Sequence, residues 1–206
     1  MGDDEAALLR AWRAGDSAAG EAFTRAYYGS ILGFFRLRAP EVADDLAQKT
    51  FLACVEGRSH VEAGNVRAFL FGIARNLLLR HLRDRHRDLD LAHFDAGRPQ
   101  SVLSPSGVIA QRHEHWLLLR ALERLPDDTQ LLLGLHYVQG LRSREIADVL
   151  GVTTTTVTTR LSRARDALRE QVATLRAPEA ARHAVLDDLE AWARSLAGLV
   201  AGEPND

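Results

Sequence analysis

Several features that would indicate common classes of protein are scarce or missing in this 206-residue chain. Cys54 is the single cysteine, so no disulfide can form within the chain and no cysteine-based zinc site is available. No apolar run approaches the roughly 18 to 20 residues of a membrane span. The N-terminus, Met1 to Glu5, is acidic, whereas a signal peptide begins with basic residues. These absences predict a cytoplasmic protein without membrane insertion.

Signatures of enzyme chemistry are missing as well. The sequence has no glycine-rich loop of the kind that holds phosphates and no nucleophile elbow. Its central histidines have spacings that match no familiar metal site, and neither a cysteine nor a paired carboxylate joins them. They are His81, His86, His93, His113 and His115. We therefore expect no catalytic residues, no metal and no cofactor.

The charges are unevenly distributed although the net charge is only −2. Between Arg67 and Arg87 six arginines accompany one aspartate, and residues 153–169 hold four arginines and one aspartate. Residues 170–206 are acidic on balance. Two basic stretches of this kind indicate local contact with a polyanion, although solvated helix faces would give the same counts.

Hydrophobic periodicity predicts an all-α protein. Apolar residues recur at three- and four-residue spacing through most of the chain, which is typical of amphipathic helices. We predict two small helical domains, 1–88 and 112–176, joined by a flexible linker at 89–111 that is rich in glycine, serine and proline. A C-terminal extension, 177–206, contains a last helix over 179–200.

The expected helices within the two domains follow from the same periodicity and from capping residues. In the helix over 41–56, the residues expected to face the core are Val42, Leu46, Phe51, Leu52 and Val55. The helices are expected at 6–14, 17–38, 41–56, 66–87, 112–125, 127–138, 143–150 and 154–175.

The segment from Ser143 to Arg160 has the pattern of a helix-turn-helix. Ser143 is expected to cap the first helix, Gly151 to supply a left-handed turn, and Thr153 to cap the second helix. An apolar stripe from Val157 to Leu168 must pack inward, so the opposite face presents threonine, serine and arginine. Such side chains suit the major groove of DNA, although neutral surface residues of an ordinary helical hairpin would look alike.

The segment 121–169 resembles the fourth conserved region of the extracytoplasmic-function (ECF) sigma factors. These are subunits of bacterial RNA polymerase in the sigma-70 family. The resemblance rests on Leu122-Glu-Arg-Leu-Pro126, on Leu141-Arg-Ser-Arg-Glu-Ile-Ala147 and on the series from Thr156 to Leu168. Many other bacterial regulators share this helix-turn-helix, so the motif alone does not identify the family.

Two segments of the N-terminal half extend the resemblance. Asp44-Asp-Leu-Ala-Gln-Lys-Thr-Phe51 resembles the stretch that docks on the clamp coiled coil of the polymerase, with Lys49 where the family usually has an acid. Val66 to Asn76 resembles the stretch that opens DNA and reads the downstream promoter element. The resemblance thus implies promoter-specific initiation, with core polymerase and promoter DNA as partners and an anti-sigma factor as a further one.

Three sets of residues follow from the resemblance and from the exposed helix faces. Core polymerase would be bound by Asp44, Asp45, Gln48 and Phe51. The downstream (−10) element would be bound by Asn65, Arg67, Phe69, Arg75, Asn76, Arg80 and Arg83. The upstream (−35) element would be bound by Thr158, Thr159, Arg160, Ser162, Arg163 and Arg165.

Other functions compete with this interpretation. A helix-turn-helix regulator that is not a polymerase subunit would use only the C-terminal half, and it leaves the pattern from Asp44 to Asn76 unexplained. A hydrolase with an appended DNA-binding domain lacks a catalytic set. The helix over 179–200 is either a regulatory latch over a basic surface or a helix that stabilises the C-terminal domain.

Overall fold

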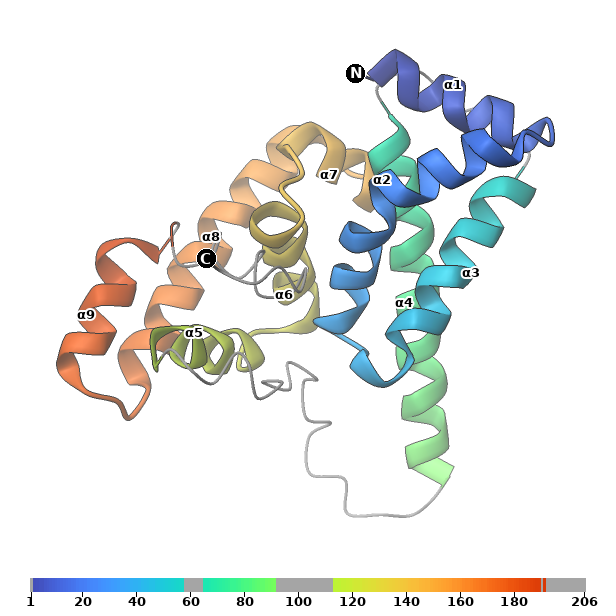
Figure 1. Cartoon of the computed structure of the whole chain (residues 1–206). Helices are drawn as coiled ribbons and strands as arrows, with labels where there is room; N and C mark the ends of the chain where they lie inside the picture. Colours follow the sequence, from blue (N-terminus) through green and yellow to red (C-terminus); the bar gives the residue numbers. More distant parts are fainter. Residues whose placement is uncertain (1, 58–64, 92–112, 190, 192–206) are drawn as a thin grey trace.

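The computed structural model describes residues 2–57, 65–91, 113–189 and 191. The predicted all-α fold is confirmed, since these residues form helices and contain no strand (Figure 1). None of the helices in these ranges combines the length and the apolar character that a bilayer crossing requires.

The first group of helices packs around an aromatic core (blue to green in Figure 1). Phe23, Phe35 and Phe71 are fully buried there, and Phe34 meets the Phe71 ring edge-on at 5.7 Å between centroids. Asp16 caps the second helix by accepting a hydrogen bond from the Ala19 amide at 3.0 Å. The elements are α1 (Gly2–Arg13), α2 (Ser17–Arg36), the 3₁₀ turn η1 (Pro40–Val42), α3 (Ala43–Glu56) and α4 (Val66–Leu91).

The second group contains the helix-turn-helix and a C-terminal helix (Figure 1). Its core is rich in leucine, including the fully buried Leu117, Leu118 and Leu135. The elements are α5 (His113–Glu123), α6 (Asp127–Leu133), the π-helical turn η3 (Gly134–Val138), α7 (Ser143–Leu150), α8 (Thr154–Thr174) and α9 (Glu179–Asp187).

Most helix boundaries lie within a few residues of the predicted ones. The helix predicted over 17–38 ends at Arg36, and the one predicted over 127–138 changes to a π-helical turn at Gly134. The helix that begins at Val66 continues to Leu91, so the first residues of the predicted linker are helical. The remainder of the linker, residues 92–112, lies outside the described residues.

One inward-facing residue was predicted wrongly. Leu52 is 54% exposed, and the buried stripe of α3 instead includes Thr50 and Cys54. Thr50 is buried because its hydroxyl donates to the Leu46 carbonyl at 2.8 Å, which satisfies the polar group inside the helix. The stripe from Ala43 to Cys54 therefore keeps helical spacing without Leu52.

The C-terminal helix packs on its own domain as far as the structure describes it. Val185 is buried, and Arg182 donates to the carbonyls of Ala173 and Leu175 at 3.3 and 3.4 Å. Figure 1 shows α9 beside α5 and the C-terminal end of α8. This packing favours the stabilising role, and Trp192, which the latch hypothesis invoked, lies outside the described residues.

Gly151 allows a prediction about stability. It is left-handed, with φ +67°, and a side chain at such a φ costs about 1–2 kcal/mol. We expect Gly151→Ala to lower the free energy of unfolding by that amount in urea denaturation. Gly72→Ala is the control, because Gly72 lies within α4 with open space around its Cα and should gain about 0.5–1 kcal/mol. Equal effects of the two changes would contradict the proposed role of the turn.

Candidate nucleic-acid interface

The helix-turn-helix has the predicted turn, but its first cap differs. The prediction that Ser143 caps the first helix is wrong, since Arg142 is the N-cap residue. Its amide donates to the Glu145 carboxylate at 2.8 Å, which ties the start of α7 together. The cap predicted at Thr153 is confirmed, because its hydroxyl accepts from the Thr156 amide at 3.2 Å.

The second helix of this motif, α8, presents a polar face. Val157, Leu161, Ala164 and Leu168 are buried, which orients the rest of the helix. The Thr158 hydroxyl donates to the Thr154 carbonyl at 2.9 Å. A ligand can therefore contact its methyl group or bind to the lone pairs of its oxygen. The predicted upstream-element residues that are exposed are Thr158, Thr159, Arg160, Ser162 and Arg163, whereas Arg165 is half-buried.

The predicted downstream-element residues on α4 have two orientations. Arg67 donates to the Gln139 carbonyl at 2.5 Å, so it faces the second group of helices. Asn76, Arg80 and Arg83 are exposed and follow one another at i, i+4 and i+7, which places them on a common side of the helix. The Arg83 Nε donates to the Leu79 carbonyl of its own helix at 3.1 Å.

Two further candidates lie near the start of α4. Asn65 is half-buried, and its carbonyl accepts from the Phe69 amide at 2.9 Å, so it begins the helix. Phe69 is also half-buried, with the Arg13 guanidinium 5.5 Å from its ring centroid. That cation–π contact occupies one face of the ring, which leaves less of it for stacking on a base. Residues 58–64, the preceding loop, lie outside the described residues.

An open cleft of about 480 Å³ brings three of the predicted DNA-binding arginines together. Arg75 of α4 lines it from the first group, and Arg160 and Arg163 of α8 line it from the second. Asp128 contributes a carboxylate to the same lining. The buried Nε of Arg75 has no hydrogen-bond partner among the described residues. The two basic stretches of the sequence therefore meet in space.

The predicted polymerase-docking helix α3 has an exposed polar face. Asp44 accepts from the Tyr28 hydroxyl at 3.2 Å, and Asp45 pairs with Lys49 at 2.6 Å. Gln48 is exposed beside them. Burial, and then the hydrogen bond to Asp44, raise the pKa of Tyr28, so its hydroxyl remains a donor at neutral pH.

Phe51 differs from the rest of that predicted set. It is 6% exposed, and its ring lies 6.1 Å from that of Tyr28 and 6.4 Å from that of Phe23. Its burial leaves little of the ring for direct contact with another protein, and the predicted contact stays a prediction. Phe51 also fixes the helix that carries Asp44, Asp45 and Gln48.

Sequence reasoning missed the residues that join the two groups of helices. Arg38 of the first group pairs with Asp127 of the second at 3.5 Å, and Gln139 receives the bond from Arg67. Periodicity identifies faces that pack within a helical domain. It carries no signal for a contact between domains, and a buried glutamine such as Gln139, 7% exposed, looks like a surface residue in the sequence.

The fold and these surfaces define a class: an all-α protein of two helical groups, one of which carries a helix-turn-helix with an exposed polar helix. Comparison with known families makes the assignment narrower. Residues 21–88 match the family described as Sigma-70 region 2, and residues 115–168 match Sigma-70, region 4.

Curated relatives and a solved structure agree with these matches. ECF RNA polymerase sigma factor SigC of Mycobacterium tuberculosis is 31% identical over 81% of this chain and 91% of its own length. RNA polymerase sigma factor YlaC of Bacillus subtilis is 28% identical over 75% of this chain and 92% of its own. The probable RNA polymerase sigma factor RfaY of Xanthomonas campestris is 34% identical over 63% of this chain. The match spans about a third of RfaY, 34% of its length.

The solved structure of CnrH in complex with the cytosolic domain of CnrY has the same fold. Its TM-score is 0.57 at 21% identity, over 82% of this chain and 97% of that one. The chain belongs to the ECF sigma factors of the sigma-70 family.

Proposed function

We propose that this chain is the subunit that directs RNA polymerase to specific promoters and helps to open them. Core polymerase binds the exposed face of α3, the downstream element binds α4, and the upstream element binds α8. The main observation in support is that one chain exposes both a face of α3 with carboxylates and a face of α8 with threonine, serine and arginine. The proposed place of action is the cytoplasm, where both partners are found.

Docking on the polymerase rests on charge-assisted hydrogen bonds. Asp44 and Asp45 are exposed carboxylates, and arginine side chains of a partner bind such groups with two parallel N–H donors. The Tyr28 hydroxyl donates to the Asp44 carboxylate and restricts its rotation in the free chain. The carboxylate therefore loses less conformational entropy when a partner binds it. Gln48 adds an amide that both donates and accepts.

Reading of the downstream element requires unstacked bases and held phosphates. Each base that leaves the duplex costs a few kcal/mol, so the protein must bind the separated strand. Asn76, Arg80 and Arg83 form a suitable stripe, since contact with the phosphate backbone needs only positive charge within reach. Phe69, whose ring has the Arg13 guanidinium over one face, is a further candidate for contact with a flipped base.

Reading of the upstream element rests on the exposed face of α8. Arg163 can donate two hydrogen bonds to a guanine in the major groove, and Thr159 and Ser162 can reach base edges or phosphates. Arg160 fits a phosphate contact better. An anti-sigma factor is a further proposed partner, because the similarly folded CnrH was solved with the cytosolic domain of a second protein.

The test is binding of the purified chain to sigma-free bacterial core polymerase. We expect Asp45→Ala to weaken the complex about tenfold, as one charge-assisted contact is worth about 1.5–3 kcal/mol. Glu21→Ala is the matched control, since Glu21 is also exposed and also pairs with a basic residue four positions later. Failure of the wild-type chain to bind core polymerase would overturn the proposal.

Lys49 should weaken binding to core polymerase, because its ammonium competes with the polymerase for the Asp45 carboxylate. Its ammonium pairs with Asp45 at 2.6 Å, and both side chains are more than half exposed. An exposed pair is worth about 0.2–1 kcal/mol, so Lys49→Ala should tighten binding to core polymerase up to about fivefold. Arg25→Ala, which frees Glu21 in the same way, should leave the affinity unchanged. Weaker binding of Lys49→Ala would show that Lys49 itself contacts the polymerase.

A further inference from the structure

Arg13, the last residue of α1, joins three helices of the first group. Its Nε and one terminal nitrogen both donate to the Cys54 carbonyl, at 3.0 and 2.7 Å. Its guanidinium also lies over the Phe69 ring of α4, 5.5 Å from the ring centroid. One side chain of α1 thus contacts the last turn of α3 and the first turn of α4. The sequence predicted no functional residue in α1, so this contact links that helix to a predicted downstream-element residue.

The two hydrogen bonds satisfy a carbonyl at the C-terminal end of α3. The last four carbonyls of an α-helix have no partner within the helix, and that of Cys54 is one of them. The negative end of the helix dipole lies at the same place, which favours a cationic donor. A planar guanidinium can donate twice to this carbonyl while it lies against an aromatic ring. The compact ammonium of a lysine does not match this geometry.

The same contact restrains the start of α4 relative to α3. Residues 57–65 join the two helices in the sequence. Asn65, a predicted downstream-element residue, begins α4 by accepting from the Phe69 amide at 2.9 Å. Because Arg13 binds the end of α3 and the Phe69 ring together, it restrains the turn of α4 that carries both predicted residues.

The orientation of the Phe69 ring matters for its proposed contact with a flipped base. The ring is half-buried, so part of it remains accessible to a ligand. The guanidinium over one face restricts the ring before any DNA binds. A side chain that is already ordered loses less conformational entropy on binding, which favours the bound state.

We propose that Arg13 is a positioning residue for the downstream promoter element, because it restrains Phe69 and the start of α4 in the arrangement that binds the separated strand. The proposal deepens the proposed function and rests on it. Arg13 acts through Phe69 rather than through its own contact with DNA. In this way α1 takes part in promoter opening.

The experiment measures promoter opening by polymerase assembled from sigma-free core and an excess of the full-length chain. The template is the promoter in the chain's own upstream genomic DNA. Permanganate reacts with unpaired thymines, so their reactivity reports how fast the downstream element opens. We expect Arg13→Lys to slow opening about tenfold, although it retains the positive charge.

A double-mutant cycle shows whether Arg13 acts through Phe69. Phe69→Leu removes the aromatic ring and retains an apolar side chain, and alone it should slow opening by a similar factor. When Phe69→Leu is present, adding Arg13→Lys should slow opening by no more than about twofold. A role of Arg13 in general stability would instead give the same loss in both backgrounds.

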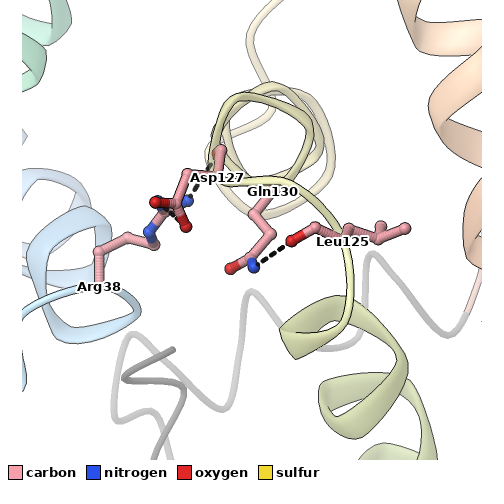
Figure 2. A network of polar contacts seen from close by, with 4 residues as sticks. All are labelled: Arg38, Leu125, Asp127 and Gln130. Atoms are coloured by element: carbon pink, nitrogen blue, oxygen red, sulfur yellow. Dashed lines mark hydrogen bonds and ion pairs between the residues drawn. The ribbon is translucent and has the colours of Figure 1, made fainter. Parts of the chain in front are cut away.

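Arg38→Lys is the matched control for the loss of an arginine–carbonyl bond. Figure 2 shows the Arg38 guanidinium pointing toward the start of α6, where it donates to the Asp127 carbonyl at 3.2 Å. Neither residue belongs to the predicted downstream-element set. We expect this variant to open the promoter at the wild-type rate. Binding of Arg13→Lys to core polymerase, measured separately, should also be unchanged.

The outcomes separate the two proposals. Normal opening with Arg13→Lys or with Phe69→Leu overturns the positioning role, and the proposed function survives in that case. An undiminished effect of Arg13→Lys in the Phe69→Leu background, or equal slowing by Arg38→Lys, overturns it as well. If the wild-type chain neither binds core polymerase nor opens the promoter, the proposed function is overturned and the positioning role falls with it.

Discussion

Replacing Arg163 with alanine should reduce transcription from the cognate promoter about tenfold to a hundredfold. Arg163 is exposed on α8, where the buried stripe from Val157 to Leu168 turns it outward. A bidentate contact of arginine with guanine contributes about 1–3 kcal/mol of discrimination. The measurement is transcription by core polymerase with each variant, together with the salt dependence of promoter binding.

Arg169→Ala is the matched control for this change. Arg169 lies on the same helix, is exposed and pairs with Asp166 at 3.3 Å. The variant therefore loses one positive charge, as Arg163→Ala does, but at a residue that is not predicted to contact DNA. Both variants should unfold like the wild-type chain, since neither side chain is buried. Equal losses of transcription in the two variants would mean that α8 contributes charge alone and does not read bases.

Phe51→Ala should lower the free energy of unfolding by about 3–5 kcal/mol, which is typical for removal of a buried phenylalanine. Its ring packs against the rings of Phe23 and Tyr28, and both contacts are lost in the variant. Urea denaturation of the full-length chain measures the effect. Binding to core polymerase should be lost only to the extent that the fold is lost.

The adjacent Leu52 provides the control. It is 54% exposed, so Leu52→Ala should change stability by no more than about 0.5 kcal/mol. The pair therefore tests which residues of α3 form the core. A stable Phe51→Ala variant that no longer binds core polymerase would support the direct contact that the resemblance implies.

Much of the fold follows from local signals in the sequence. The helix over Ser143–Leu150 was predicted with its observed bounds, because a short apolar stripe ends at a glycine that can adopt a positive φ. The threonine cap before α8 was predicted for a similar reason. Such signals depend on residues a few positions apart, which the sequence presents directly.

Buried polar residues were harder to predict, because their burial depends on hydrogen-bond partners. Thr50 looks like a surface residue, yet its hydroxyl bonds within the helix and it replaces Leu52 in the core. Gln139 and Arg38 look polar and solvated, yet they are buried between the two groups of helices. Their burial is possible only because partners distant in the sequence complete their hydrogen bonds. The interface between the two groups was therefore beyond sequence reasoning.

The most direct test of the sigma-factor function is transcription by sigma-free core polymerase on the chain's own upstream genomic DNA, with the transcript starts sequenced. We predict specific starts that require the chain and that become much weaker with Asp45→Ala and with Arg163→Ala. No association with core polymerase, combined with tight binding of the chain alone to duplex DNA, would contradict the account. That result would describe a helix-turn-helix regulator that is not a polymerase subunit.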